Sequence, residues 1–280
     1  MLRFEPGREP VEPKAAATLL VLRDGDAGPE LFCVRRHAAS AFMGGAVVFP
    51  GGKLDEADAA PAFESLTSGL APRSELVADG PTQARALAVC ACREALEEAM
   101  LLVGDPSLDD TALGAMRASL EGGESFATLL EQAGIRLATD RLIPFARWVT
   151  PTAESRRYDA RFYLARAPEG QGGLHDEHET VSSVWSTPAR MLGAFDAGDV
   201  FLAPPTTRCL ELLKGAVDVD AALALASDQS LAPICPELLP SEDRIVLALP
   251  GDPAHSVKDR RVAGPTRFIM EDGRLISADP

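Results

Sequence analysis

Near the start of the chain, apolar residues come in short blocks separated by turn-forming residues, a pattern typical of β-strands. The segments "AAATLLVLRDG" and "PELFCVRR" are rich in Val and Leu and are joined by "DGDAGP", so they predict a strand, a turn and a strand. "AVVFP" predicts a third short strand that stops at Pro50. At Gly51 and Gly52 we expect a sharp turn that comes close to a ligand, because glycine has no side chain.

A helical period begins near Thr82, in "TQARALAVCACREALEEAMLLV". Apolar residues recur there at three- and four-residue spacing with few helix breakers, which predicts one long helix reaching Val103. The preceding segment, from Ala59 to about Gly80, is rich in Ala, Ser, Pro and Gly and only weakly periodic. It predicts an irregular or partly helical insertion.

The rest of the chain mixes helical and strand patterns. The helical segments are "DDTALGAMRASLEG", "ESFATLLEQAG", "PARMLGAFDAG", "PPTTRCLELLKG" and "DVDAALALAS", and the strand-like ones are "LIPFARWVT", "RRYDARFYLARA", "VSSVWST" and "RIVLALPGD". From Tyr158 to Leu164 the period is two, which predicts one buried face. No internal repeat or break in composition divides the chain, so we expect a single α/β domain with helical additions.

Composition and charge narrow the classes of function. The 280 residues are 46% hydrophobic and 25% charged, which is ordinary for a globular protein. A formal net charge of −15 opposes nucleic-acid binding, because affinity for the phosphate backbone comes from clustered Lys and Arg. The five cysteines are irregularly spaced and form no CxxC pair, so neither a disulfide framework nor a zinc site is expected.

The sequence also bears on location. The first residues, "MLRFEPGREPVEPK", lack the apolar centre of a signal peptide, and no later run reaches the roughly 20 apolar residues of a membrane span. The final "LISADP" matches no peroxisomal or endoplasmic-reticulum address. We therefore expect a cytoplasmic protein with no membrane partner.

Three glutamates, Glu94, Glu97 and Glu98, crowd one patch of the predicted long helix. Like charges at this spacing repel by a few tenths of a kcal/mol per pair, and a divalent cation would remove that cost. Carboxylate oxygens suit Mg²⁺, with Mn²⁺ as a possible substitute. The alternative, a solvated acidic helix face, stays open because Glu is a good helix former.

The segments around these acids resemble the box of the Nudix hydrolases, G-x(5)-E-x(7)-R-E-U-x-E-E-x-G-U, in which U is aliphatic. Gly52 begins the box, Asp58 stands at its first acidic position, and "REALEEAML" supplies its end. There are three departures: Asp58 replaces a Glu, residues 59–92 replace the seven-residue gap before Arg93, and Met100 replaces a Gly. The long gap, with "LFCVRRHAASAFMGGAVVFPGGKLDEAD" and "RWVTPTAESRRYDARFYLA", resembles a long-insert subgroup that includes a peroxisomal coenzyme A diphosphatase.

This resemblance implies an α/β/α sandwich with a mixed β-sheet and extra helices. Its expected parts are an irregular leader at 1–13, a Nudix domain at 14–215 with an insertion at 59–84, and an extension at 216–280 packed on the same domain. The implied reaction is Mg²⁺-dependent hydrolysis of a nucleoside diphosphate linked to another group. Coenzyme A or acyl-coenzyme A comes first among substrates, and ADP-ribose or NADH next.

The resemblance also implies roles for residues of the box. Glu94, Glu97 and Glu98 are the expected metal ligands, and Glu97 or Glu98 is also a candidate general base. Arg93 would orient Glu97 or Asp58 by a bidentate pair. Glu179 stands where some family members carry an additional catalytic acid, although "HDEHET" can equally be a polar loop.

Substrate contacts are expected from Arg35 and Arg36, at the end of the second strand, and from Gly51 and Gly52. Salt bridges at a sheet edge are an alternative role for the two arginines. The coenzyme A subgroup has an Arg at the position of Arg36, which this chain keeps.

Two other functions stay open at this stage. A nucleotide-binding Nudix sensor or scaffold without catalysis is favoured slightly by the departures from the box, and disfavoured by the intact "REALEE". An RNA 5′-end pyrophosphohydrolase is disfavoured by the acidic charge. Family members are often dimers, so a homodimer is also open.

Overall fold

A computed structural model describes residues 9–39, 43–241 and 244–280. In these ranges eight strands form one mixed sheet in the order β10-β3-β2-β1-β8-β7, with β4 paired to β1 and β9 paired to β2. The strands are β1 (Lys14–Gly25), β2 (Gly28–Arg36), β3 (Ala46–Val48), β4 (Gly51–Lys53), β7 (Ile143–Val149), β8 (Tyr158–Arg166), β9 (Thr180–Ser186) and β10 (Phe201–Leu202). The pairs β1–β8 and β10–β3 are parallel and the others antiparallel.

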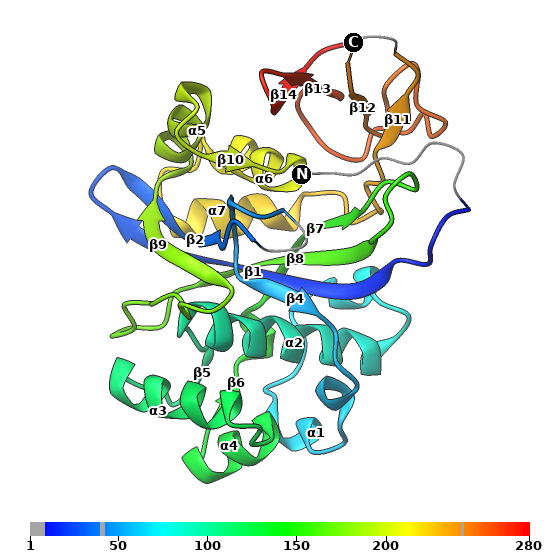
Figure 1. The fold of residues 1–280 in the computed structure, drawn as a ribbon. Helices are drawn as coiled ribbons and strands as arrows, with labels where there is room; N and C mark the ends of the chain where they lie inside the picture. The colour runs from blue at the N-terminus through cyan, green and yellow to red at the C-terminus, as the bar shows by residue number, and fades with distance from the viewer. Residues whose placement is uncertain (1–8, 40–42, 242–243) are drawn as a thin grey trace.

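Helices cover both faces of this sheet (Figure 1). On one side lie α1 (Phe63–Leu66), α2 (Pro81–Ala99), α3 (Asp110–Glu121) and α4 (Phe126–Ala133), and on the other α5 (Pro188–Ala197), α6 (Pro204–Leu213) and α7 (Val219–Ser227). The predicted α/β sandwich with a mixed sheet is confirmed. No helix in the described part of the chain is both long and apolar enough to cross a bilayer.

The strand–turn–strand prediction at the start of the sheet is also confirmed. Strands β1 and β2 form an antiparallel hairpin closed by the pair Gly25 and Gly28. Gly28 has φ +115°, a backbone conformation that glycine adopts without a steric penalty. The hairpin places Arg36 at the far end of β2.

Two hydrophobic cores lie on opposite faces of the main sheet, and residues of β8 contribute to both. Tyr163 packs into the core beneath α2, and its neighbour Leu164 packs into the core beneath α6 and α7. Because both faces are covered, all residues from Arg161 to Ala165 are buried. The prediction of a single buried face is therefore wrong for this half of the strand.

The insertion between Asp58 and α2 is largely ordered. It contains α1 and the short 3-10 helix η2 (Ser74–Val77), and the 3-10 helix η1 (Glu56–Ala59) precedes it. Arg136 ties it to the body of the protein by donating to the carbonyl oxygens of Ser65 at 3.2 Å and Thr67 at 2.8 Å. Other short elements nearby are β5 (Gly104–Asp105), β6 (Arg136–Leu137) and η3 (Thr139–Arg141).

Gly51 and Gly52 lie in strand β4, so the predicted sharp turn at this pair is wrong. Both pair with β1, Gly51 opposite Thr18 and Gly52 opposite Ala17. Close approach, rather than an unusual φ, requires glycine here. A Cβ on Gly51 would lie 2.5 Å from the carbonyl oxygen of Ala17.

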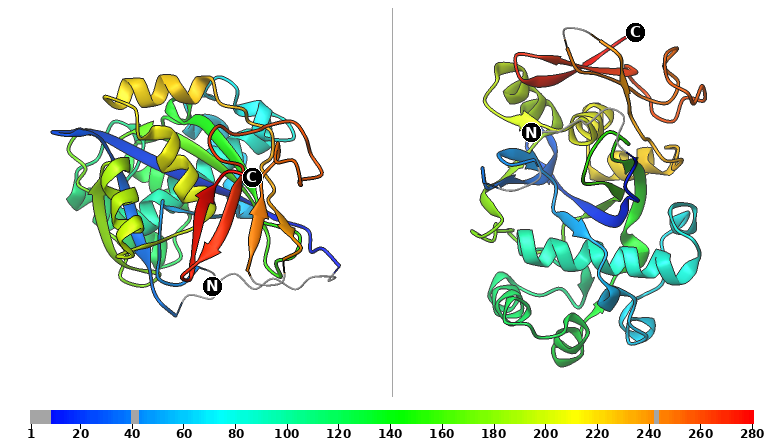
Figure 2. Two further views of the ribbon diagram at one scale, coloured as in Figure 1. Left: turned by 90° about the horizontal axis from the view of Figure 1, so that it is seen from above. Right: turned by 45° about the vertical axis from the view of Figure 1, so that its right-hand side comes forward.

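A second, smaller sheet follows α7 and lies beyond α6 (Figures 1 and 2). It consists of β11 (Glu237–Leu239), β12 (Val246–Ala248), β13 (Arg267–Glu271) and β14 (Arg274–Ala278), all antiparallel. We call it the C-terminal sheet. The sequence predicted the strand in "RIVLALPGD" but not the other three. The predicted leader falls mostly on residues 1–8, which lie outside the described residues.

Candidate active site

The C-terminal half of α2 carries the charged residues of the predicted site. The helix begins at Pro81, whose missing N–H costs nothing at a first helical position. Its apolar residues, among them Leu96, pack into the core under the sheet. The carboxylates of Glu94 and Glu98 emerge beside β4, where the two glycines leave room for them.

Arg93 gathers three carboxylates around its guanidinium. It holds Asp58 in a bidentate pair, Nε to Oδ1 at 2.8 Å and Nη2 to Oδ2 at 2.9 Å. Its Nη1 donates to both Glu94 and Glu97 at 2.8 Å. The two alternatives predicted for Arg93 are thus both present, with Asp58 taking the bidentate position.

Asp58 is positioned by its own short helix as well as by Arg93. It is the third residue of a capping box in η1, in which its side chain accepts the backbone N–H of Asp55 at 2.9 Å. The side chain is 2% exposed. A buried carboxylate with these partners orients Arg93 and is too enclosed to contact a substrate.

Gly51 and Gly52 shape the surroundings of the two buried glutamates. The backbone N–H of Gly51 donates to Glu98 Oε2 at 3.0 Å. A Cβ on Gly52 would lie 2.5 Å from the carboxylate of Glu94. The second glycine therefore forms a cradle that any larger residue would fill.

Both glutamates have raised pKa values. Burial raises the pKa of Glu98 to about 8, against the lowering effects of the Gly51 N–H and Arg36. Burial likewise raises the pKa of Glu94 to about 7, although Arg93 opposes it. The pKa of Glu97 is also raised, first by burial. Such shifts are typical of carboxylates gathered at functional sites.

Arg36 lies between Glu98 of α2 and Glu179 in the loop before β9. Its Nη1 lies 3.7 Å from Glu98 Oε1, and its Nη2 lies 3.4 Å from Glu179 Oε2. Its Nε is buried without a hydrogen-bond partner in the described residues. Arg35, one residue earlier, is exposed and does not join this group.

Several of these side chains line a cavity of about 380 Å³. Arg36, Gly51, Gly52, Glu94, Glu98 and Glu179 all line it, whereas Arg35, Arg93 and Glu97 do not. The structure therefore brings together six of the nine predicted site residues around one space. Arg93 and Glu97 adjoin it through their ion pairs with Glu94 and with each other.

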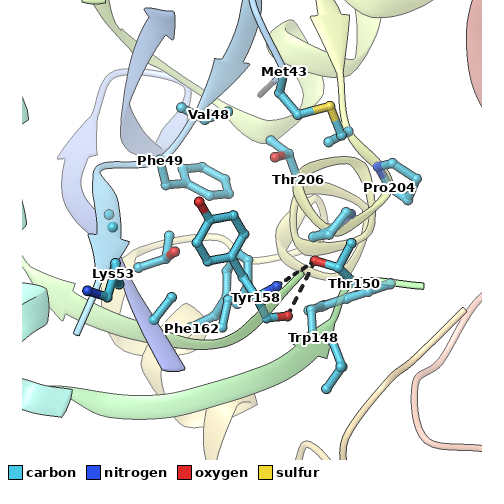
Figure 3. Close-up of a pocket in the computed structure, with 18 of the residues that line it drawn as sticks. Met43, Val48, Phe49, Lys53, Trp148, Thr150, Tyr158, Phe162, Pro204 and Thr206 are labelled. Carbon is cyan, nitrogen blue, oxygen red and sulfur yellow. Dashed lines mark hydrogen bonds between the residues drawn. The ribbon is translucent and has the colours of Figure 1, made fainter. Parts of the chain in front are cut away.

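Sequence reasoning missed the other walls of the cavity. Tyr158, Ala160 and Phe162 line it from β8, and Trp148 lines it from β7. Figure 3 shows these strands on one side and Pro204 and Thr206 of α6 on another. The alternating pattern of β8 was the signal that could have found the three β8 residues, because they share one face of the strand.

The predicted ligands Glu94, Glu97 and Glu98 imply a metal ion, and their positions show whether they could hold one. Among the described residues no three or more His, Cys, Asp or Glu side chains are arranged as a metal site, because Arg93 bridges Glu94 and Glu97 and Arg36 lies beside Glu98. The oxygen donors of Glu94, Glu98 and Glu179 nevertheless face the same cavity. Oxygen donors of this kind, with the cradle at Gly52, fit a hard divalent cation.

Comparison with known proteins agrees with the resemblance to the Nudix hydrolases. A family model described as the NUDT19 Nudix domain matches residues 14–213. The acyl-coenzyme A diphosphatase NUDT19 of Gallus gallus is 26% identical over 299 residues, covering 88% of this chain and 78% of that protein. Its counterpart from Xenopus laevis is 24% identical, covering 80% and 70%.

A solved structure is similar as well. The NUDIX hydrolase from Alicyclobacillus acidocaldarius superimposes with a TM-score of 0.66 at 27% sequence identity, covering 76% of this chain and 96% of that one. The match covers about three quarters of this chain, so the similarity extends well beyond the acidic box.

Proposed function

Because this chain belongs to the Nudix hydrolases, enzymes that act on diphosphate bonds, and matches their NUDT19 domain, we propose that it cleaves coenzyme A or acyl-coenzyme A. The proposal requires a divalent cation, Mg²⁺ first and Mn²⁺ as a substitute. ADP-ribose and NADH are the next candidates, since each contains a diphosphate bond between two larger groups.

One observation carries the choice of substrate. The cavity is lined by Arg36 and the carboxylates of Glu94, Glu98 and Glu179, and most of its other lining side chains are apolar. A diphosphate with a nucleotide on one side and a long, weakly polar arm on the other matches this division. Both NUDT19 relatives are acyl-coenzyme A diphosphatases, which supports the same choice.

Each charged residue of the site has a proposed role in the reaction. Glu94 and Glu98, with Glu97 after release from Arg93, would hold the cation, which when bound screens the diphosphate charge and acidifies water. Arg36, which lines the cavity, would donate to a phosphoryl oxygen through its guanidinium. Glu179, 64% exposed at its side chain, would accept a proton from the attacking water, with Glu97 or Glu98 as the alternative base.

A substrate panel tests the proposal. The purified protein is incubated with coenzyme A, hexanoyl-coenzyme A, ADP-ribose or NADH, with Mg²⁺, with Mn²⁺, or with a chelator, and products are identified by mass. We expect coenzyme A to give adenosine 3′,5′-bisphosphate and phosphopantetheine. A preference for ADP-ribose or NADH would overturn the substrate choice.

One variant tests the role of Glu98 in the same assay. Glu98→Gln keeps the shape of the side chain but removes its charge, and we expect turnover to fall by about 10²- to 10⁴-fold. Binding of coenzyme A by calorimetry without any cleavage by the native protein would instead favour a nucleotide-binding sensor.

A further inference from the structure

Part of the cavity wall is made of apolar side chains from three parts of the chain. Trp148 and Phe162 come from the main sheet, Pro204 from the start of α6, and Pro236 and Leu247 from the C-terminal sheet and the residue before it. None of these five side chains is charged. The occupant of this part of the cavity should therefore be largely apolar.

The C-terminal sheet is firmly attached where it contributes to this wall. Arg208 of α6 is fully buried and donates to the carbonyl oxygens of Ala263 and Pro265, both at 2.6 Å, and to Ser277 Oγ at 3.1 Å. Arg208 lies one turn along the helix whose first residue, Pro204, also lines the cavity. The C-terminal sheet therefore has a fixed position relative to α6.

Leu247 is the middle residue of strand β12 in the C-terminal sheet. It pairs with Leu238 on β11 and with Phe268 on β13, and it is 1% exposed. The loop that follows β12 is ordered around Asp252, which accepts from Thr266 Oγ1 and Arg267 Nε at 2.9 Å each. Leu247 is thus a rigid part of the cavity wall.

Trp148 provides a polar feature in this apolar region. Its side chain is 3% exposed, and its indole Nε1 has no hydrogen-bond partner in the described residues. Buried donors are nearly always satisfied in folded proteins. The nitrogen is itself buried, so a carbonyl oxygen of a ligand in the cavity would supply the missing acceptor once the indole turns toward it.

We propose that Trp148 and the C-terminal sheet, through Pro236 and Leu247, form the binding pocket for the acyl-pantetheine arm of the substrate. The arm is an apolar chain with amide and thioester carbonyls, which matches apolar walls with one unpaired N–H donor. The inference deepens the proposed function and rests on it. It gives the C-terminal sheet a role in selecting among acyl chains.

Binding of the arm can be measured without catalysis. Trp148 and Trp185 are the two tryptophans of the chain, so Trp185→Phe leaves Trp148 as the single fluorescent reporter. Hexanoyl-pantetheine, which has no phosphate, is titrated into this variant with a chelator present. We expect saturable change in tryptophan emission, larger than with unacylated pantetheine and absent with ADP, and no change with hexanoyl-pantetheine would overturn the proposal.

Leu247 tests selection by chain length. Leu247→Phe narrows the pocket and Leu247→Ala widens it, so the ratio of kcat/KM for decanoyl- over acetyl-coenzyme A should fall and rise respectively, by about tenfold. Leu239→Phe is the matched control, because Leu239 pairs with Val246 on the opposite face of the same sheet and is not part of the cavity wall. An unchanged ratio in both Leu247 variants, with folding verified by thermal melting, contradicts the assignment.

Trp148→Phe removes the indole N–H but keeps an aromatic ring, so it tests the proposed hydrogen bond to the ligand separately from the packing. We expect KM for hexanoyl-coenzyme A to rise severalfold with kcat nearly unchanged, and KM for ADP-ribose, where it is cleaved, to stay the same. Arm binding without diphosphate cleavage would reject the proposed function and keep the pocket. If Leu247→Phe, Leu247→Ala and Trp148→Phe all cleave acyl-coenzyme A with the kcat and KM of the native protein, the pocket is rejected and the proposed function is kept.

Discussion

Arg93 and Asp58 are joined by two parallel hydrogen bonds of 2.8 and 2.9 Å, although 34 residues, 59–92, separate them in the chain. The pair fixes the start of the insertion against helix α2. It also turns the guanidinium so that its remaining edge meets Glu94 and Glu97. The shorter Asp in place of the family's Glu is accommodated because η1 brings its backbone close to α2.

Removal of Arg93 should destabilise the protein more than neutralisation of Asp58. Arg93→Ala leaves Asp58 buried and without its cation, and we expect a loss of about 3–5 kcal/mol in the free energy of unfolding. Asp58→Asn leaves Arg93 paired with Glu94 and Glu97, so its loss should be smaller. Urea unfolding followed by circular dichroism measures both, and equal losses would contradict this account of the pair.

Cation binding should stabilise the protein more at high pH than at low pH. The folded pKa of Glu98 is about 8 and that of Glu94 about 7, both above the ordinary value of 4.5. Between pH 4.5 and 8 the folded chain therefore holds more protons than the unfolded chain, and the metal-free protein loses stability as pH rises. A cation needs the ionised carboxylates, so its stabilising effect grows over the same range.

Thermal melting with excess Mg²⁺ and with a chelator, at pH 6 and pH 8.5, measures this effect. We expect a larger Mg²⁺-dependent increase in Tm at pH 8.5. In Glu98→Gln the Mg²⁺-dependent increase in Tm should be smaller. The fall in Tm of the metal-free protein between pH 6 and pH 8.5 should also be smaller. An increase that is the same at both pH values would argue against Glu94 and Glu98 as ligands.

Arg36 should matter for substrate affinity, and Arg35 should not. Arg36 lines the cavity with an unpartnered Nε, whereas Arg35 is exposed outside it. A charge-assisted hydrogen bond is worth about 1.5–3 kcal/mol, so Arg36→Ala should raise KM for coenzyme A by about 10- to 100-fold. Arg35→Ala, the adjacent control, should change it by no more than about twofold. Similar increases in steady-state KM for both variants would contradict the assignment.

Some of this structure could be predicted from the sequence because the signals are local. The β1–β2 hairpin follows from two apolar runs around a Gly-containing turn, and α2 follows from a sustained helical period. The acidic patch follows from the spacing of Glu94, Glu97 and Glu98. Its relation to Asp58 came from the family pattern, because local spacing cannot specify a contact across an insertion.

Other features depend on contacts that no local pattern records. Strands β12 and β13 are short and separated by an 18-residue connection, 249–266, so their pairing is invisible in either segment alone. The Gly51–Gly52 pair suggests a turn in isolation, but its role is set by Glu94 and by β1, which approach it in the folded protein. Trp148 lines a cavity because the C-terminal sheet completes the wall.

Met100, the residue that departs from the family's Gly, ends helix α2. It has φ 52° and ψ 43°, in the left-handed region where glycine is favoured. Its backbone N–H still donates to Leu96 O at 3.0 Å, and the next N–H donates to Ala95 O at 3.1 Å. Its side chain is 7% exposed within the core under α2.

These two properties of Met100 act in opposite directions on Met100→Gly. Glycine would relieve a left-handed backbone that costs about 1–2 kcal/mol in other residues, but loss of the buried side chain costs about 2–5 kcal/mol. The second effect is larger, so restoring the family's residue should destabilise the protein by about 1–3 kcal/mol in urea unfolding. Met100→Leu, which keeps both the backbone strain and the packing, should change stability by less than about 1.5 kcal/mol. A more stable Met100→Gly protein would mean that the packing of this side chain contributes less than its burial indicates.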